Sequence, residues 1–504
     1  MTQVRSVLIL IFLSFFFSLE LFSQTGGDAI INPNTYIGKK IEYFFFDIKG
    51  NASGVSTTAK ASDYYVTDDI NGIRVSIYGD DAHPAHPAVG TVVASEYTAM
   101  INSIKNARAA RVGKDFYVFA SKKLDGQNSF PAWTKDANGV IVTEYVKLLV
   151  DYFQFMKDND ITIDYLAIQN EEAYNEGNIT PAKHKAIIDS VRAFTARMGV
   201  KMPLIVGYED YDPNNSNWMK NLYTSNWMDR MDIYGTHYYP HLRPMSKLLS
   251  DLSYANAANK PFWSTEPHWD NKDTEDDWVE AEEGMCAFWD QIEVGMTGFM
   301  WWAYARSGSL RGNLMRATSV PMKDAQMIDM NDIDGKGTTT YGKLQTRAFR
   351  EGNKITVYAI NNHATTVYTN YGFGLSVGSI VGNVTATQWT KSSGSIAGAV
   401  STITPESATK YRMTLLAGSI TVFSFNVDTQ TSTNMINAKS AKFLNHNNRL
   451  KIISENSNFR YQIFNVDGRK IDDNIYSESI DTSLLPRGIY IIRLSDGTTE
   501  KLVF

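Results

Sequence analysis

Residues 163–177 read IDYLAIQNEEAYNEG, an apolar run that ends at Gln169 and then opens onto Asn170, Glu171 and Glu172. A short apolar run bounded by polar residues is typical of a buried strand. Carboxylates at the tip of such a strand add nothing to a core, whereas they are well placed to act on a bound molecule. The stretch therefore predicts a strand with a candidate active site at its C-terminal end.

Strand patterns alternate with helix patterns on both sides of this stretch, from about residue 40 to residue 305. The strand patterns cover residues 72–78, 115–121, 163–171, 202–210, 231–239, 260–267 and 296–305. The helix patterns cover residues 94–111, 144–160, 181–199, 216–223 and 277–295. This alternation indicates βαβ units and a parallel sheet. So many units predict an α/β fold, a closed (β/α)8 TIM barrel over residues 25–340, with its active site at the C-terminal ends of the strands.

The pattern changes after about residue 340 to short alternating strands with Gly, Ser and Asn turns. Residues 341–427 therefore predict an antiparallel β-sandwich side domain. The polar, aperiodic residues 428–441 are typical of a linker. A second, small β-sandwich is expected over residues 442–504, where Asp-Gly pairs at 467–468 and 496–497 indicate hairpin turns.

The N-terminal residues 1–24 predict a secretory signal peptide, with Arg5 before a short apolar segment and small or polar residues near Ser23. No other run reaches the 18 or so apolar residues of a spanning helix, so we expect a secreted or cell-surface protein without a membrane span. Cys286 is the only cysteine. It excludes an intramolecular disulfide and is expected to be buried and inert.

The net charge of −6 does not favour a nucleic acid as partner. The 27 Tyr and 10 Trp residues suit a carbohydrate surface on which sugars stack, although ordinary use in the core also explains them. We expect a monomer that acts on a polysaccharide and needs neither a cofactor nor a metal.

Two carboxylates that flank the scissile bond commonly hydrolyse polysaccharides, one as a proton donor and one as an ionised nucleophile. Their surroundings must push the two pKa values apart. Glu171 and Glu266 each follow an apolar strand and precede a loop rich in aromatic and amide residues, which makes them the candidate pair. Glu172 competes with Glu171 for the acid role, but adjacent residues of a strand point to opposite faces. The alternative interpretation of each glutamate is an exposed loop carboxylate.

The motifs AIQNE at 167–171 and WSTEP at 263–267 resemble the acid/base and nucleophile strands, fourth and seventh, of the clan of retaining (β/α)8 glycosidases. Other stretches resemble glycoside hydrolase family 30 and its glucuronoxylanase branch. They are FYVFASKKLDGQNSFPAWTK at 116–135, MDIYGTHYYP at 231–240, GFMWWAYARSGS at 298–309 and the β-rich segment that begins with QWTKSSGS at 388. The resemblance covers about residues 70–426.

This resemblance implies a role for each matching residue. Glu171 would be the general acid/base and Glu266 the nucleophile. The residues implied to support the nucleophile, bind the sugar or line the site are Arg74, Asn170, His237, Tyr239 and Trp302, together with Trp133 in the aromatic and proline-rich loop after the third strand. Considered without the family, Arg74 is interpreted as a paired charge at the core edge and His237 as a structural histidine.

Arg306 follows a Trp-Trp pair, where the resemblance implies an arginine that binds a glucuronate side group. Arg311 and Arg316 follow it closely. An arginine fork binds a carboxylate or sulfate through two parallel hydrogen bonds. The alternative interpretation of residues 306–316 is a solvated basic loop.

The chain also departs from the family pattern. The segment IEYFFFDIKGNASG at 41–54 lacks the usual Gly-Phe-Gly-Gly turn, and WSTEPHWD at 263–270 differs after the nucleophile. Residues 313–337 are unlike the corresponding xylanase loop, and DMNDIDG within them lacks the full ligand spacing of a calcium loop. These departures affect the substrate more than the chemistry.

Residues 442–504 resemble the sorting domain of the type IX secretion route, with a Gly-Ile-Tyr strand and a basic residue near the end. The alternative is a small β-sandwich that binds carbohydrate. The sequence as a whole predicts a secreted retaining endo-glycosidase of a β-linked polysaccharide, with glucuronoxylan as the first choice of substrate. The alternatives are an endo-hydrolase of a β-galactan, such as an anionic algal galactan, and a non-catalytic polysaccharide-binding protein.

Overall fold

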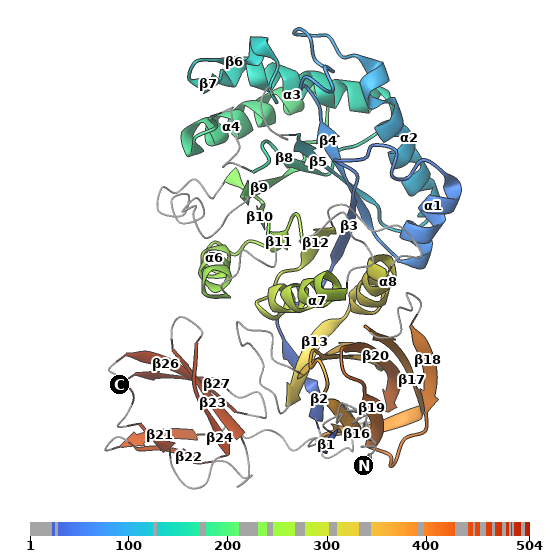
Figure 1. Cartoon of the computed structure of the whole chain (residues 1–504). Coiled ribbons are helices and arrows are strands. Elements are labelled where there is room, and N and C mark those ends of the chain that lie inside the picture. The colour runs from blue at the N-terminus through green and yellow to red at the C-terminus, as the bar shows by residue number, and fades with distance from the viewer. Residues whose placement is uncertain are drawn as a thin grey trace, which may run out of the picture.

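The computed structural model of the chain contains a barrel, a β-sandwich and a small C-terminal β module (Figure 1). The residues it describes are 23–25, 29–123, 129–171, 178–210, 230–238, 245–267, 278–301, 310–331, 344–391, 398–428, 442–446, 449–453, 460–465, 469–475, 480–482, 485, 488–494 and 499–503. The predicted signal peptide lies almost wholly outside these residues.

Eight parallel strands form a closed barrel, which confirms the predicted fold class. In chain order they are β3 (Tyr43–Asp47), β4 (Gly72–Ile77), β5 (Tyr117–Lys122), β8 (Tyr165–Ala167), β9 (Leu204–Asp210), β10 (Ile233–Thr236), β11 (Phe262–Ser264) and β12 (Gly298–Trp301). The barrel closes where β12 pairs with β3. Parallel strands in register place their C-terminal ends at one mouth of the barrel, which is where the predicted carboxylates lie.

Helices cover the outside of the barrel (Figure 1). They are α1 (Thr58–Ser62) with the π-helical turn η1 (Asp63–Thr67), α2 (Ala94–Ala110), α3 (Val142–Asp158), α4 (Pro181–Met198), α6 (Met245–Ala257), α7 (Trp278–Glu293) and α8 (Leu310–Met322). The start of α4 follows from its sequence, because the Thr180 side chain accepts a hydrogen bond from the Lys183 amide and Pro181 takes the first turn. Helices α6 and α8 were not among the predicted elements.

Large aromatic side chains fill the middle of the barrel. Phe45, Tyr165 and Trp263 pack edge to face or tilted against one another, with ring centroids 4.9–5.9 Å apart. Two glycines make room for them, because a Cβ at Gly72 would lie 2.3 Å from the Phe45 ring and one at Gly298 would lie 2.8 Å from the Trp263 ring. This layer separates the two mouths of the barrel, so each mouth has its own set of polar side chains.

The side domain is one ten-stranded sheet whose path runs β1-β16-β2-β13-β14-β15-β20-β17-β18, with β19 paired to β16. Its strands are β1 (Ser23–Thr25), β2 (Ala29–Ile37), β13 (Gln326–Asn331), β14 (Leu344–Glu351), β15 (Lys354–Asn361), β16 (Val367–Leu375), β17 (Ser379–Thr390), β18 (Ala399–Ile403), β19 (Lys410–Leu415) and β20 (Ser419–Asp428). Strands β2 and β13 come from the segment that the sequence analysis assigned to the barrel. Most pairs are antiparallel, but β16 pairs in parallel with β1 and β2.

The sandwich packs against the barrel through α7 and α8. Arg347 of β14 is buried and its Nη2 lies 3.3 Å from the Glu293 carboxylate of α7. The Tyr358 hydroxyl of β15 donates to the Ala317 carbonyl of α8 at 2.7 Å. Cys286, also on α7, is buried as predicted. Through these contacts the sandwich packs against the last two helices of the barrel, α7 and α8.

The C-terminal module contains β21 (Lys442–His446), β22 (Arg449–Ile453), β23 (Arg460–Asn465), β24 (Lys470–Ile475), β25 (Ile480–Asp481), β26 (Ile489–Leu494) and β27 (Thr499–Val503). Its two predicted hairpins are present, because β23 pairs with β24 and β26 with β27, both antiparallel. Among the described residues, no helix has the length and apolar character needed to cross a membrane.

Candidate active site

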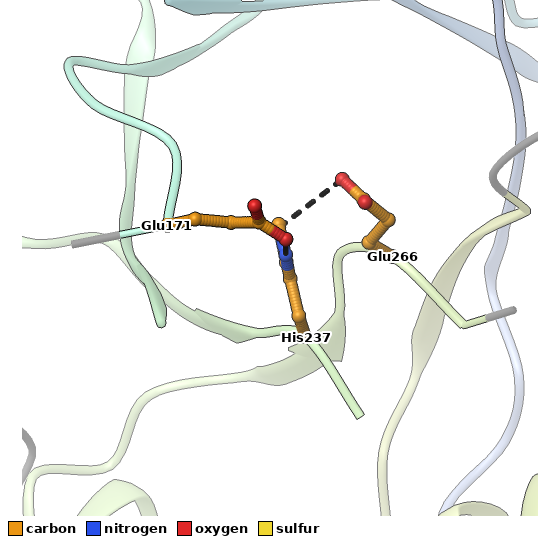
Figure 2. A group of neighbouring side chains, drawn as sticks. All are labelled: Glu171, His237 and Glu266. Carbon is orange, nitrogen blue, oxygen red and sulfur yellow. Dashed lines mark hydrogen bonds and ion pairs between the residues drawn. The ribbon is translucent and has the colours of Figure 1, made fainter. Parts of the chain in front are cut away.

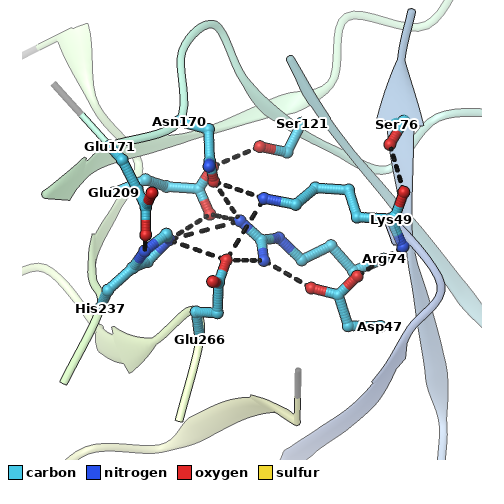
Figure 3. A network of polar contacts seen from close by, with 10 residues as sticks. All are labelled: Asp47, Lys49, Arg74, Ser76, Ser121, Asn170, Glu171, Glu209, His237 and Glu266. Carbon is cyan, nitrogen blue, oxygen red and sulfur yellow. Dashed lines mark hydrogen bonds and ion pairs between the residues drawn. The ribbon is translucent and has the colours of Figure 1, made fainter. Parts of the chain in front are cut away.

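The C-terminal mouth of the barrel contains a dense network of charged and amide side chains (Figure 3). Each member lies in a barrel strand or just after one. They are Asp47 and Lys49 from β3, Arg74 and Ser76 of β4, Ser121 of β5, Asn170 and Glu171 after β8, Glu209 of β9, His237 after β10 and Glu266 after β11. The closed barrel thus brings together residues from seven parts of the sequence.

Arg74 is at the centre of the network and is fully buried. Its Nη1 donates to Asp47 Oδ2 at 2.5 Å and to Glu266 Oε2 at 2.7 Å. Its Nη2 donates to Asn170 Oδ1 at 2.8 Å and to Glu209 Oε1 at 2.7 Å. Burial alone would lower the pKa of the guanidinium, but the surrounding carboxylates raise it well above its usual value. Arg74 therefore stays charged and holds the predicted nucleophile in place.

Glu266 is surrounded by cations. Its Oε2 accepts from Arg74 and also lies 3.2 Å from Lys49 Nζ and 3.4 Å from His237 Nε2. Burial raises the pKa of a carboxyl, but here His237, Lys49 and Arg74 outweigh burial and hold the pKa of Glu266 well below its usual range. Glu266 is therefore ionised at neutral pH, as a nucleophile must be.

His237 lies between the two predicted catalytic carboxylates (Figure 2). Its Nδ1 is 3.0 Å from Glu171 Oε1, and its Nε2 faces Glu266. Burial favours the neutral ring, but the charge of Glu266 and the hydrogen bonds to Glu171 and Glu209 raise the pKa of His237 to about 9. A protonated imidazole donates at both nitrogens, so His237 bridges the pair rather than serving as a base.

The backbone at Glu171 is unusual and is held by Glu209. Both residues have positive φ, 49° at Glu171 and 51° at Glu209, a region that non-glycine residues rarely adopt. The Glu171 amide donates to the Glu209 carbonyl at 2.9 Å. The Glu209 side chain in turn accepts from Arg74 and from the Ser121 hydroxyl. Strain of this kind is concentrated at functional sites, where it fixes the direction of a side chain.

The spacing of the two carboxylates decides what they can do. One carboxylate oxygen of Glu171 lies within 4.8 Å of one of Glu266, with His237 beside both (Figure 2). Retaining glycosidases place their two carboxyl groups about 5–5.5 Å apart, whereas inverting enzymes leave about 6.5–9.5 Å for a water molecule. The spacing is closer to that of retaining enzymes than to that of inverting enzymes.

The same three residues have the spacing of a metal site, since one ligand atom from each of Glu171, His237 and Glu266 lies within 4.8 Å of the others. Positive charge already surrounds these residues. A histidine ligand must be neutral, so a metal would have to displace the proton that a pKa of about 9 keeps on His237. Arg74 and Lys49 already neutralise Glu266. The donor set therefore fits an organic substrate better than a cation.

The structure brings together five of the nine predicted site residues, namely Glu171, Glu266, Arg74, Asn170 and His237. Trp133 lies in the 3-10 turn η2 (Ala132–Thr134) after β5, where its indole N–H donates to the His86 carbonyl and its ring packs against the barrel core. The predicted residues Tyr239, Trp302 and Arg306, and the competing Glu172, lie outside the described residues.

The structure does not support a loop over the second half of the basic run 306–316. Helix α8 begins at Leu310, so Arg311 and Arg316 belong to a helix rather than to a loop. Arg316 Nε donates to Asp68 Oδ1 at 2.5 Å, where Asp68 follows η1. Arg316 is therefore engaged in the barrel wall.

Lys49, Asp47, Glu209 and Ser121 were not predicted as site residues. The sequence contains a signal for two of them: Asp47 ends the apolar run YFFFD, and Glu209 ends IVGYE, in the same way that Asn170 and Glu171 follow YLAIQ. Lys49 and Ser121 carry no such signal, because a single lysine after a strand and a serine within one are common.

The chain is similar to known glycoside hydrolases. Residues 123–323 match the family model of glycosyl hydrolase family 59. The chain is 25% identical over 242 residues to a glucuronoxylanase of Bacillus subtilis (strain 168), a match that covers 45% of this chain and 54% of that protein. The chain thus spans about half the length of the curated relatives it matches.

Solved structures similar to the chain include a glycoside hydrolase family 30 endoxylanase from Clostridium papyrosolvens, with a TM-score of 0.59 and 18% identity over 79% of this chain and 100% of that one. A family 30 subfamily 8 xylanase from Clostridium acetobutylicum gives a TM-score of 0.56 and 18% identity over 79% of this chain and 99% of that one. These findings confirm the resemblance to family 30 and the TIM-barrel fold.

Residues 446–504 match the family model of the secretion system C-terminal sorting domain, which confirms the predicted identity of the C-terminal module. A sorting domain indicates a protein that is secreted or held at the cell surface.

Proposed function

We propose that this protein is a retaining endo-glycosidase that hydrolyses a β-linked polysaccharide by double displacement, with Glu266 as nucleophile and Glu171 as general acid/base. The observation that carries the proposal is the pair of carboxylates within 4.8 Å of each other, one of them held ionised by buried cations. Such a pair matches what double displacement requires and has no evident purpose in a barrel built only for stability.

In the first step an oxygen of Glu266 attacks the anomeric carbon and forms a glycosyl ester. The bond to the leaving oxygen breaks as Glu171 transfers its proton to that oxygen. In the second step Glu171 removes a proton from water, the water oxygen attacks the anomeric carbon, and Glu266 leaves as a carboxylate. Arg74 and His237 stabilise the Glu266 carboxylate before the attack and after its release.

Glucuronoxylan is our first choice of substrate. Support comes from the similar proteins and solved structures, which include a glucuronoxylanase and two xylanases. Arg306 is the residue that we propose to bind the acidic side group. Tyr239 and Trp302 are proposed to line the sugar site. Trp133, which follows β5, is proposed to contact the polysaccharide.

The partner for export is proposed to be the type IX secretion machinery, which would recognise the C-terminal module. The match to a sorting domain over residues 446–504 supports this proposal. The module is small, with a core of seven buried apolar residues among those described, and it joins the sandwich through residues 429–441.

The test is a hydrolysis screen of the purified full chain against a panel of methylglucuronoxylan, undecorated xylan, neutral β-galactan and an anionic algal galactan, with product sizing. We expect oligosaccharides of several sugars from methylglucuronoxylan, as endo action produces. Cleavage of a galactan with no action on xylan would refute glucuronoxylan as the substrate but would leave the proposed hydrolytic mechanism standing. No hydrolysis of any polysaccharide, with binding retained, would instead indicate a non-catalytic binding protein.

A further inference from the structure

Lys49 is a buried lysine in the active-site network, two residues beyond the end of β3. It falls in the segment IEYFFFDIKGNASG, where the chain departs from the Gly-Phe-Gly-Gly turn of the resembling family. A lysine ammonium is strongly hydrated, and burying it is costly unless charged or polar partners replace the water. Its position beside the proposed nucleophile therefore needs a reason.

The backbone of Lys49 is held by the same residue that holds Arg74. The Lys49 amide donates to Asp47 Oδ1 at 2.7 Å, while the other Asp47 oxygen accepts from Arg74. The Ser76 hydroxyl of the neighbouring strand donates to the Lys49 carbonyl at 3.1 Å. One carboxylate thus sets the positions of two cations, so the lysine side chain enters the site from a fixed point (Figure 3).

The ammonium reaches the two residues on which the proposed chemistry depends. Lys49 Nζ donates to Asn170 Oδ1 at 2.6 Å and to Glu266 Oε2 at 3.2 Å. Arg74 donates to the same two oxygen atoms. With two cationic donors on Oδ1, the amide of Asn170 is fixed with its NH2 group turned away from them, which leaves that group to donate to a sugar hydroxyl.

We infer that Lys49 is a positioning residue for the proposed reaction: with Arg74 it fixes one oxygen of Glu266 and the amide orientation of Asn170, and it keeps the nucleophile ionised. This inference rests on the proposed function. The charged groups that face Glu266 are Lys49 and Asp47 from β3, Arg74 of β4, Glu171 after β8, Glu209 of β9 and His237 after β10. Of the cations, Lys49 is the one that the family resemblance did not supply.

The experiment compares Lys49→Met and Lys49→Gln with Lys49→Arg and the wild type. Both neutral variants remove the charge, and Gln can still donate to Asn170. An opposite charge within about 4–6 Å lowers a carboxyl pKa by about 1–3 units, so its loss should move the acidic limb of the kcat/KM profile up by at least about one pH unit. We expect kcat to fall about 10- to 100-fold and KM to change less, since the lost interaction serves the transition state.

Lys122→Met is the matched control, because Lys122 is a buried lysine at the end of β5 whose Nζ donates to the Ser129 and Lys123 carbonyls. This variant loses a buried ammonium without touching Glu266, so its acidic limb should stay in place. Lys49→Arg should keep the wild-type limb. An unmoved limb in both neutral variants, or the same shift in Lys122→Met, would overturn the inference.

A second readout separates this inference from the proposed function. Because its pKa is depressed, Glu266 stabilises the fold above its unfolded pKa, and that contribution is lost as the pH falls. Removing Lys49 weakens it, so the gap in unfolding temperature between wild type and Lys49→Met should narrow from pH 7 to pH 3. Lys49→Arg, which keeps the positive charge, is the reference for this readout, and its gap should stay constant. If the wild type hydrolyses no polysaccharide, the proposed function fails. If the gap in unfolding temperature between wild type and Lys49→Met is the same at every pH, the inference about Lys49 fails, whatever the outcome of the hydrolysis assay.

Discussion

The two mouths of the barrel both carry clusters of charged side chains, and they differ in burial. At the N-terminal mouth a cleft of about 530 Å³ is lined by Asp69, Arg111, Lys323 and Asp324 among others, and the acidic side chains of these pairs are 31–43% exposed. At the C-terminal mouth the side chains of Arg74, Asp47 and Glu209 are not exposed at all. Water can solvate the first cluster but not the second.

The pKa values differ in the same way. At the N-terminal mouth partial burial raises the pKa of Asp69, but Lys323 and Arg111 outweigh it, and the acid and its partners simply stabilise each other. At the C-terminal mouth burial raises the pKa of Asp47 despite Arg74 and Lys49, while the pKa of Glu266 is held well below its usual value. Exposed pairs contribute little to stability, and buried clusters are costly to build. This difference is what the proposed chemistry at the C-terminal mouth requires.

The largest expected effect is the loss of the proposed nucleophile. Glu266→Gln keeps the shape of the side chain but cannot form the glycosyl ester, so kcat/KM on the best substrate should fall on the order of 10⁴-fold or more. Steady-state hydrolysis assays of the two proteins measure this. A variant as active as wild type would show that Glu266 is not the nucleophile and would remove the proposed distinction between the two mouths.

Removal of the central cation should be the largest effect on stability. Arg74→Met leaves Asp47, Glu209 and Glu266 buried with fewer partners, and breaking a buried pair in this way costs about 3–5 kcal/mol. The free energy of unfolding, measured by urea denaturation at pH 7, should fall by that amount. A loss below about 1 kcal/mol would mean that the buried cluster behaves like the exposed one.

The protonated His237 predicts a stability change on the alkaline side. Its pKa of about 9 in the folded chain lies above the unfolded value of 6.5, so its contribution is complete below pH 6.5 and is lost as the pH rises through 9. That difference corresponds to about 3 kcal/mol at most. The unfolding temperature of wild type should fall between pH 7 and pH 10 more than that of His237→Gln. Parallel curves would contradict the raised pKa.

The smallest effect is expected at the N-terminal mouth. Asp69→Asn removes a carboxylate that pairs with Arg111 and Lys323 but is partly solvated. Its cost should stay within about 1 kcal/mol in urea denaturation, with kcat/KM unchanged. A large loss of activity from this variant would show that the two mouths are coupled and that their separation by the aromatic layer is incomplete.

Much of the barrel was predictable because its signal is local. Each strand pattern from 72–78 onward and most helix patterns match an element of the structure, since apolar periodicity is set by neighbours in the sequence. The assignment of β2 and β13 to the sandwich was not predictable from the sequence. Strand β2 lies before the barrel in the chain, and its partners β13 and β16 lie after it. Such pairings depend on the closed fold, and no local pattern records them.

The candidate site divides in the same way. Glu171, Glu266 and Asn170 were predictable because polar residues directly follow apolar strands. Lys49 was not predicted, since its importance comes from its contact with Glu266 across the barrel. Glu209 ends an apolar run as well, but its role comes from its contact with Arg74. The positive φ of Glu171 and Glu209, and the hydrogen bond between their backbones, are likewise indicated by no sequence pattern.

The most direct test of the central claim is the configuration of the first sugar released, followed by proton NMR in the first minutes of hydrolysis before mutarotation. A nucleophilic Glu266 within 4.8 Å of Glu171 requires two inversions at the anomeric carbon, so the new reducing end should appear first as the β-anomer. Release of the α-anomer first would mean a single displacement by water and would contradict the account.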